Sequence, residues 1–211
     1  CDNPLEGGTT PSYGVIRRAR EAVSIQLFPI IRPRSRDYLY GDDEWQAVLD
    51  DITICKELGC DGVSAGAQKI TGEIDADRMR AIVETAYPMQ VTCNRAFDAV
   101  PDPFDALEIL IDAGCKRVLT SGLAETAPQG GELLSKLVKQ AGDRISIMPG
   151  SGVRSDNVRK LMEDTGAYEF HTSARKTRAS PLEFTNPRVT DAGNVYVADR
   201  DELARIMNVL R

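Results

Sequence analysis

The sequence contains one histidine and five cysteines, and no two of the cysteines form a Cys-x-x-Cys pair. A single histidine cannot build a usual zinc site, which takes three or four nitrogen or sulfur ligands. The odd number and the spacing of the cysteines do not suggest the disulfide framework of a small secreted protein. These shortages exclude the common zinc modules and predict a reducing, cytoplasmic compartment.

Long apolar runs and blocks of basic residues are also missing. No apolar stretch approaches the ~20 residues that a membrane-spanning helix needs, and the first residues, CDNPLEGG, lack the basic and apolar regions of a signal peptide. The net charge is −6, and an acidic chain without a basic block repels the phosphate backbone of nucleic acids. We therefore expect no membrane and no nucleic-acid partner, and a small molecule or a metal ion as the ligand.

The sequence does contain a regular alternation of strand-like and helix-like segments over its 211 residues. The strand-like segments are short apolar runs. In several helical segments apolar residues recur three and four apart, after an acidic or serine cap or before a glycine. Such alternation predicts a parallel sheet with helical crossovers. We expect strands over 24–31, 61–67, 90–97, 116–122, 144–152 and 168–175, and helices over 12–22, 43–59, 75–86, 102–114, 130–142, 155–166 and 199–210.

The ends of the predicted strands carry polar residues, which helps to choose between a doubly wound sheet and a (β/α)8 barrel. Such groups follow five strands, as Asn94, Arg95 and Asp98 do in the third. In a barrel all these ends meet at one mouth, where barrel active sites lie, whereas a doubly wound sheet needs them only at its switch point. The sequence therefore favours an α/β fold of the TIM-barrel type, forming a single domain over residues 1–211.

The number of predicted strands is smaller than a complete barrel requires. We identify six, whereas a barrel has eight. Residues 1–20 hold no complete strand, so the first βα unit and most of the second strand would precede Cys1. The alternative is that the fold is not a closed barrel.

The stretch PGSGVRSDN (149–157) is a glycine-containing loop between a predicted strand and a predicted helix. Backbone N–H groups of Gly150, Ser151 and Gly152 could point at an anion, aided by the helix dipole. A tight turn would explain the glycines equally well. The loop is therefore a candidate anion site with a purely structural alternative.

Three arginines near strand ends, Arg32, Arg34 and Arg95, could supply fixed positive charge for a carboxylate or a phosphate. They could equally form structural salt bridges. The acids nearest to them in the pattern are Asp37, Asp98 and Glu6.

Proton transfer has two further candidates. His171 lies at a strand end, where a general acid–base would be useful, although a core histidine bonded to the backbone is the alternative. Asp98 and Glu6 are carboxylates that could transfer protons, but a helix cap or an arginine partner would explain each of them.

A copper site is the metal site that these residues allow. Cu(I) is a soft ion that accepts thiolate ligands, and Cys1 and Cys93 are the thiols at strand ends. Cys55, Cys60 and Cys115 lie on a helix or at strand starts, where we expect core residues.

Six stretches along the chain form a specific set: CDNPLEGGTTPSYG (1–14), FPIIRPRSRDY (28–38), NRAFD (94–98), RVLTSG (117–122), MPGSGVRSDN (148–157) and HTSA (171–174). With these stretches the chain resembles, over essentially its whole length, the CutC family, whose members are named copper homeostasis proteins. The resemblance implies a (β/α)8 barrel whose first βα unit and one further strand precede Cys1.

The chain departs from the family pattern at the mouth. Family members usually have a histidine where Asn94 stands, and two glycines of the family stretch PRGGD are replaced in PRSRD (33–37). Losing the imidazole removes a group that could transfer protons or bind a metal. Arg95 and Asp98 remain, so a ligand could still be positioned.

The resemblance implies a role in copper homeostasis, with Cu(I) bound through Cys1, because the thiols near the family's N-terminus are its suggested copper ligands. A second interpretation is an enzyme or binding protein for a small anionic metabolite, bearing phosphate or carboxylate, at the mouth. A third is a barrel that acts through contacts in a homodimer. For the metabolite the candidate catalytic residues are His171 and Asp98, and the candidate ligand-binding residues are Glu6, Arg32, Arg34, Asn94, Arg95, Ser121, Gly150, Ser151, Gly152 and Ser173.

Overall fold

Four parallel strands form the central sheet in a computed structural model of the chain, which describes residues 1–184, 186, 188 and 194–210. They are β1 (Gly62–Ala65), β2 (Gln90–Cys93), β3 (Arg117–Thr120) and β4 (Ser146–Pro149). The strands are hydrogen-bonded in the order of the sequence. This is the order of a (β/α) barrel, and it lacks the reversal that defines a doubly wound sheet.

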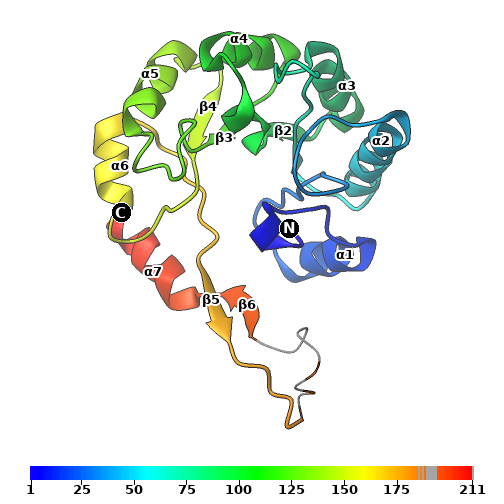
Figure 1. Cartoon of the computed structure of the whole chain (residues 1–211), viewed down its shortest axis with the longest axis vertical. Coiled ribbons are helices and arrows are strands. Elements are labelled where there is room, and N and C mark those ends of the chain that lie inside the picture. Colours follow the sequence, from blue (N-terminus) through cyan, green and yellow to red (C-terminus); the bar gives the residue numbers. More distant parts are fainter. Residues whose placement is uncertain (185, 187, 189–193, 211) are drawn as a thin grey trace.

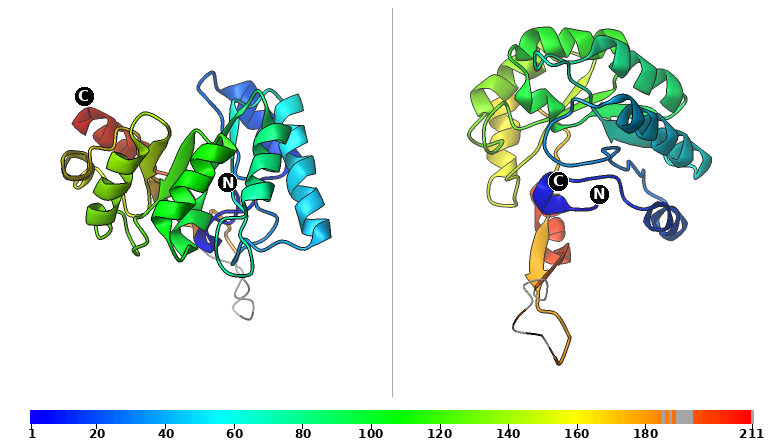
Figure 2. Two further views of the ribbon diagram at one scale, coloured as in Figure 1. Left: turned by 90° about the horizontal axis from the view of Figure 1, so that it is seen from above. Right: turned by 45° about the vertical axis from the view of Figure 1, so that its right-hand side comes forward.

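The helices form an arc with the sheet on its inner side (Figure 1), and the arc is open between α1 and the hairpin at the opposite end. The right-hand view of Figure 2 shows the same arc. The expected α/β fold of the barrel type is therefore confirmed, although β1 and β4 do not pair with each other within the described residues. The helices are α1 (Tyr13–Ala22), α2 (Asp42–Glu57), α3 (Ala76–Ala86), α4 (Pro103–Ala113), α5 (Gly131–Ala141), α6 (Val158–Thr165) and α7 (Arg200–Val209), with short 3-10 helices η1 (Pro4–Glu6) and η2 (Arg95–Ala99).

Local signals in the sequence explain where the helices begin and end. The side chain of Asp102 accepts hydrogen bonds from the first two N–H groups beyond Pro103 in α4, and Gly114 ends that helix with φ of 90°. Asp75 caps α3 in the same way. One face of each of these helices packs on the strands, and side chains such as Leu107 are completely buried there. The strand ends are thereby held by a packed core.

The predicted strand over 24–31 forms only in part. Its last residues run parallel to β1, where Ser64 donates to the carbonyl of Pro29 over 2.9 Å and accepts from Ile31 over 2.8 Å. Only Ile30 forms a bridge with Ser64. Pro29 has no N–H to donate, and no described strand pairs with the outer edge of this segment. The segment lies beside the sheet as an irregular edge.

The predicted strand over 168–175 is wrong except at Arg175. One backbone bond, from His171 to Pro149 over 2.9 Å, ties this segment to the end of β4. The regular strand begins later, as β5 (Arg175–Arg178), and pairs antiparallel with β6 (Val195–Ala198), which the sequence did not predict. A strand needs a continuous ladder on at least one side, and apolar composition alone does not supply it.

The predicted helix over 155–166 is shorter at its start. α6 begins at Val158, and Asn157 makes no side-chain cap there. Ser155 instead donates its N–H and its hydroxyl to the carboxylate of Glu202 in α7, over 2.8 and 3.0 Å. The turn before α6 is therefore tied to the last helix of the chain. Among the described residues, no helix has both the length and the apolar content needed to cross a membrane.

Candidate functional site

Two cavities include residues at the carboxyl ends of the strands, and the larger one also runs along the inner face of the sheet as far as Arg117, the first residue of β3. The larger has a volume of about 850 Å³ and the smaller about 360 Å³. Arg95, Tyr38 and Gly7 line both cavities. Asn94, Ser151, Gly152, His171 and Ser173 line the larger one, and Glu6, Arg32 and Asp98 line the smaller one.

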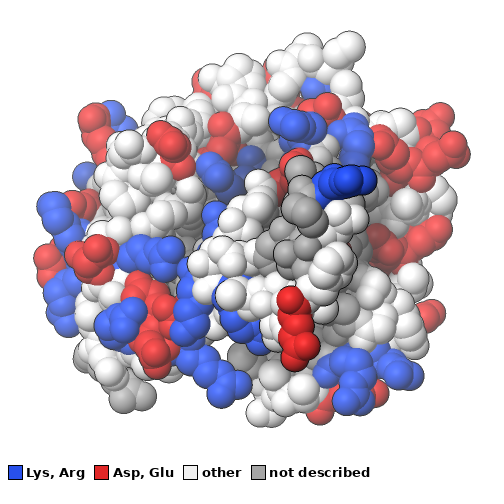
Figure 3. Space-filling model, turned by 60° about the horizontal axis from the view of Figure 1, so that its bottom comes forward, with Lys and Arg blue, Asp and Glu red and all other residues white. Residues whose placement is uncertain are grey.

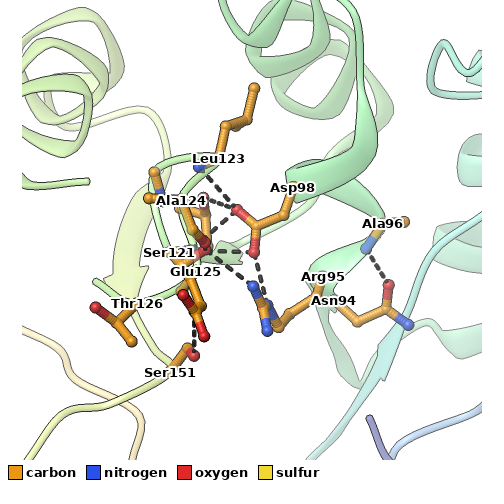
Figure 4. A network of polar contacts seen from close by, with 12 residues as sticks. Asn94, Arg95, Ala96, Asp98, Ser121, Leu123, Ala124, Glu125, Thr126 and Ser151 are labelled. Atoms are coloured by element: carbon orange, nitrogen blue, oxygen red, sulfur yellow. Dashed lines mark hydrogen bonds and ion pairs between the residues drawn. The ribbon is translucent and has the colours of Figure 1, made fainter. Parts of the chain in front are cut away.

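A hydrogen-bonded cluster between β2 and β3 fixes Arg95 at the border of the two cavities (Figure 4). Its Nε donates to Asp98 over 2.7 Å, and its Nη2 donates to the hydroxyl of Ser121 over 2.9 Å. Asp98 also accepts from the hydroxyl of Thr120 over 2.5 Å and from backbone N–H groups of Ser121 and Leu123. The Asp98 side chain is 9% exposed, and that of Arg95 is 40% exposed. Asp98 therefore positions Arg95, whose outer edge stays accessible.

Arg32 is buried, with 3% of its surface exposed. Its two terminal nitrogens donate to three backbone carbonyls, those of Glu6, Gly8 and Arg36, over 2.7–3.2 Å. Its Nε has no hydrogen-bond partner among the described residues, and the guanidinium lies 4.5 Å from the centre of the Tyr38 ring. No described carboxylate forms a salt bridge with Arg32. Its positive charge is therefore not neutralised by an acid.

Gly7 allows the loop to approach Arg32 closely. A Cβ on Gly7 would lie 2.8 Å from Nη1 of Arg32, and the residue has φ of 83°. A larger residue here would push the guanidinium away or strain the loop. The glycine of the NPLEGG stretch thus serves the arginine site.

Arg34 has a different environment from Arg32. It donates to Glu44 over 2.6 Å and to Asp37 over 2.9 Å, and these bonds raise the pKa of Arg34 and lower the pKa of both carboxyls. Arg34 lines neither cavity. Its assignment as a ligand-binding residue stays a prediction, and the geometry supports the structural salt bridge.

The glycine loop after β4 shapes the wall of the larger cavity. Gly150 donates its N–H to Thr120 over 2.9 Å, and a Cβ there would lie 2.4 Å from Leu119. Ser151 and Gly152 have φ of 74° and 72°, and the described residues offer no hydrogen-bond acceptor to the N–H groups of Ser151, Gly152 and Val153. Three successive free N–H groups in a bend are suited to an anion.

The helix dipole contributes less than the sequence suggested. α6 starts at Val158, six positions beyond Gly152, and the effect of a helix dipole fades beyond its first turn. The N–H of Ser155 already donates a hydrogen bond to the carboxylate of Glu202. The loop rather than the helix therefore supplies the donors.

His171 faces the larger cavity from the segment beside β4. The imidazole is exposed to the cavity, but partial desolvation by the surrounding protein lowers its pKa, and the positive charges of the N-terminal amine and of Arg95 add smaller effects in the same direction. The ring is therefore mostly neutral at pH 7 and can accept a proton. Ser173 lines the same cavity two residues later.

Asn94 stands where the family pattern has a histidine. Its side chain is 2% exposed, and its Oδ1 accepts from the N–H of Ala96 over 3.0 Å. Its Nδ2 has no hydrogen-bond partner among the described residues. The side chain turns away from the cluster around Asp98 (Figure 4). An unpartnered amide donor thus lies in the wall of the larger cavity.

The two thiols predicted at strand ends lie in different environments. Cys1 is exposed and lines the larger cavity, whereas Cys93 is buried, donates to the carbonyl of Asn94 over 3.5 Å and has a raised pKa because of burial. Within the described parts of the chain, no three or more His, Cys, Asp and Glu side chains are grouped to hold a metal ion. A single accessible thiol is a poor fit to the soft, thiolate-rich sites that favour Cu(I).

Several residues of the cavity walls were not among the ligand-binding residues predicted from the sequence. A basic residue after the glycine loop and a short basic patch near residue 175 were visible signals, but nothing in the sequence marked the tyrosine as a wall residue. The missed residues are Arg36, Tyr38, Arg154 and Arg175.

The walls carry an excess of positive charge. Four arginines and one glutamate line the larger cavity, and three arginines and two acids line the smaller one. Salt bridges neutralise Arg95 and Arg117, but none of the described acids pairs with Arg32, Arg36, Arg154 or Arg175. Outside the cavities charges of both signs are interspersed (Figure 3), and the chain as a whole is acidic. The excess is therefore local to the two cavities.

A sequence model of the CutC family matches residues 1–176. The chain belongs to the CutC family. The CutC protein of Parabacteroides distasonis is 50% identical to it over 200 residues, which cover 94% of this chain and 82% of the relative. That of Chromobacterium violaceum is 47% identical and covers 87% of this chain and 74% of the relative.

Solved structures agree with this assignment. A crystal structure of CutC from Streptococcus agalactiae, provisionally named a copper homeostasis protein, has a TM-score of 0.78 and 31% identity, and covers 81% of this chain and 85% of its own. The deoxyribose phosphate aldolase of Aeropyrum pernix has a TM-score of 0.58 at 20% identity, and covers 76% of this chain and 69% of its own. The second likeness concerns the fold alone. The barrel architecture is thus shared by CutC proteins and aldolases.

Proposed function

We propose that this CutC protein binds a small anionic metabolite, bearing phosphate or carboxylate, at the mouth of the barrel. The observation that carries the proposal is the buried guanidinium of Arg32, which no described carboxylate neutralises. A buried charge without a counter-charge costs several kcal/mol, and a bound anion would offset that cost. Arg95 and the free N–H groups after Gly150 supply further donors on the same mouth.

The electrostatic field also favours an anionic ligand. Positive walls inside a cavity of low dielectric attract anions over a longer range than exposed charges do. The acidic remainder of the surface repels large polyanions, so a small ligand fits better than a nucleic acid.

If the bound metabolite is transformed, His171 is the candidate for proton transfer. Its neutral imidazole faces the cavity. Asp98 is less suited, because both its oxygens already accept hydrogen bonds. We assign Asp98 a positioning role toward Arg95.

Titration calorimetry with inorganic phosphate at low ionic strength tests the proposal. We expect measurable binding that weakens at least tenfold in Arg32→Gln, because a hydrogen bond to a charged group contributes about 1.5–3 kcal/mol. Arg34→Gln is the matched control, since Arg34 comes from the same loop but is held by Glu44 outside the cavities. Arg95→Gln serves as a second variant if Arg32→Gln does not fold. Absence of binding to the parent protein, or an equal loss in the control, would overturn the proposal.

Copper handling is the second candidate function, supported by the family name and by the exposed thiol of Cys1 in the larger cavity. A Cu(I) competition titration with a colorimetric chelator, on the parent chain and on Cys1→Ser, tests it. Tight one-to-one binding that is lost in the variant would support it. Binding that the substitution does not change would eliminate Cys1 as a ligand.

Two further expectations stay proposals. All five cysteines are free thiols, which supports a reducing, cytoplasmic compartment. The apolar side chains of Leu203, Met207 and Leu210 are exposed at the end of the chain, which supports a homodimer. Sedimentation of the purified chain would measure the second.

A further inference from the structure

The mouth contains two cavities that a wall divides. The N-terminal loop around Gly7 lies between them, and Arg95 and Tyr38 contribute to both. Their volumes, about 360 and 850 Å³, each fall within the size range of sites for small metabolites, about 300–1,000 Å³.

Each cavity has one buried side chain with an unpartnered nitrogen donor. In the smaller cavity it is Arg32, whose Nε lacks an acceptor, and in the larger cavity it is Asn94, whose Nδ2 lacks one. Both side chains are at least 97% buried. Both nitrogens lie beneath the cavity surface, as does the unpartnered hydroxyl of Tyr40, which lines neither cavity, so the groups that can meet a ligand are the charges and N–H groups of the walls.

Each cavity also has its own uncompensated positive charge. Arg32 and Arg36 lie in the smaller one, and Arg154 and Arg175 in the larger one, all without a salt bridge to a described acid. Arg154 follows the free N–H groups of the glycine loop. Arg175 donates to the carbonyl of Pro4 over 3.2 Å, which ties the dividing loop to the larger cavity.

We propose that the two cavities are two subsites of one binding site, and that the ligand is a small metabolite with two anionic groups, either two phosphates or a phosphate and a carboxylate. This inference rests on the proposed function, since it names the class of anion that the mouth takes. The group in the smaller subsite faces Arg32 and Arg36. The group in the larger subsite faces the N–H groups after Gly150. Arg95, at the border, faces the part of the ligand that joins them.

The experiment compares monomethyl phosphate with a series of alkanediol bisphosphates of increasing chain length, by titration calorimetry. Joining two groups that bind at separate subsites turns the second binding into an intramolecular event, which increases affinity by about 10²–10⁴-fold when the spacer fits. We expect one spacer length to bind at least a hundredfold more tightly than monomethyl phosphate, and shorter spacers to bind less well.

Two pairs of variants assign the gain to the subsites. Gly152→Asp places a negative charge beside the free N–H groups, and Gly152→Asn is its neutral control, since both residues tolerate positive φ. In the smaller subsite, Arg36→Glu introduces a negative charge and Arg36→Gln is its neutral control. The side chain of Arg36 is exposed. Each acidic variant should reduce the affinity for the best bisphosphate to about that for monomethyl phosphate, and should reduce it at least tenfold more than its neutral partner does. The Arg36 pair keeps the test decisive if the Gly152 variants do not fold.

The outcomes separate the inference from the proposed function. If one monomethyl phosphate binds per chain and no bisphosphate binds more tightly than it does, the two-subsite inference is overturned, whereas the proposed anion site stands. A gain that survives both acidic variants would also overturn it. If neither the monophosphate nor any bisphosphate binds, the proposed function itself fails.

Discussion

Replacing Asp98 with alanine removes the acceptor at the centre of the cluster that holds Arg95. Four donors lose their partner: Nε of Arg95, the hydroxyl of Thr120 and the N–H groups of Ser121 and Leu123. Removing one member of a buried ion pair costs about 3–5 kcal/mol, and each unsatisfied buried donor costs about 1–3 kcal/mol. Water can reach part of Arg95, which is 40% exposed, so we expect the lower end of this range, about 3 kcal/mol.

Urea unfolding at neutral pH, followed by circular dichroism, measures this loss as a change in midpoint at constant slope. Asp37→Ala is the control, because Asp37 also pairs with an arginine but its side chain is 62% exposed, and exposed pairs contribute about 0–1 kcal/mol. Asp98→Asn keeps the shape and should fall between the two. A loss for Asp98→Ala below about 1 kcal/mol, or one no larger than that of the control, would refute the reasoning.

Three further predictions concern single groups. The lowered pKa of His171 predicts that an NMR titration shows its ring protonating below the usual pH of about 6.5. Because His171 of the unfolded chain takes up its proton at a higher pH than that of the folded chain, the stability of the protein should decrease as the pH falls through that value. His171→Gln should remove this pH-dependent part of the stability. The pKa of Glu202 is lowered mainly by a backbone N–H before α6, so its contribution is complete above pH 4.5 and is lost as the pH falls; Glu202→Gln should therefore unfold at lower urea than the parent at neutral pH and at a similar concentration in acid. A Cβ on Gly66 would lie 2.5 Å from Oδ1 of Asn94, so Gly66→Ala should destabilise the protein by about 1–3 kcal/mol, whereas Gly131→Ala, which meets no atom within 4 Å, should be neutral or stabilising; equal melting temperatures for the two would contradict the packing argument.

Much of the fold could be predicted because its signals are local. Caps such as Asp75 and Asp102 act on N–H groups within three residues, and apolar spacing marks the packed helix faces. The segment over 168–175 could not be predicted correctly, since its apolar residues resemble a strand while the ladder depends on neighbours distant in sequence. Local pattern carries no information about which partner is present.

The candidate site was predictable in part for the same reason. Polar residues after each strand pointed to the mouth, and Arg95 lies there. The difference between Arg32 and Arg34 was not visible, because the partners of Arg32 are carbonyl oxygens, which every residue has. Which arginine meets an acid depends on how the loop turns, and Arg36, with φ of 84°, is part of that turn.

The hairpin of β5 and β6 leaves the barrel after Ala174 and returns to it at Asp199. The N–H of Asp199 donates to the carbonyl of Ala174 over 2.5 Å, and its carboxylate pairs with Lys176 over 3.0 Å. The match to the family ends at residue 176, at this same point. Because the two contacts of Asp199 hold both ends of the hairpin together, the chain between Lys176 and Asp199 can change in length without moving the residues of the mouth. The part of the chain between Lys176 and Asp199 is therefore the natural place to graft an epitope or a reporter domain onto this scaffold, because Arg175, which lines the larger cavity, lies before it.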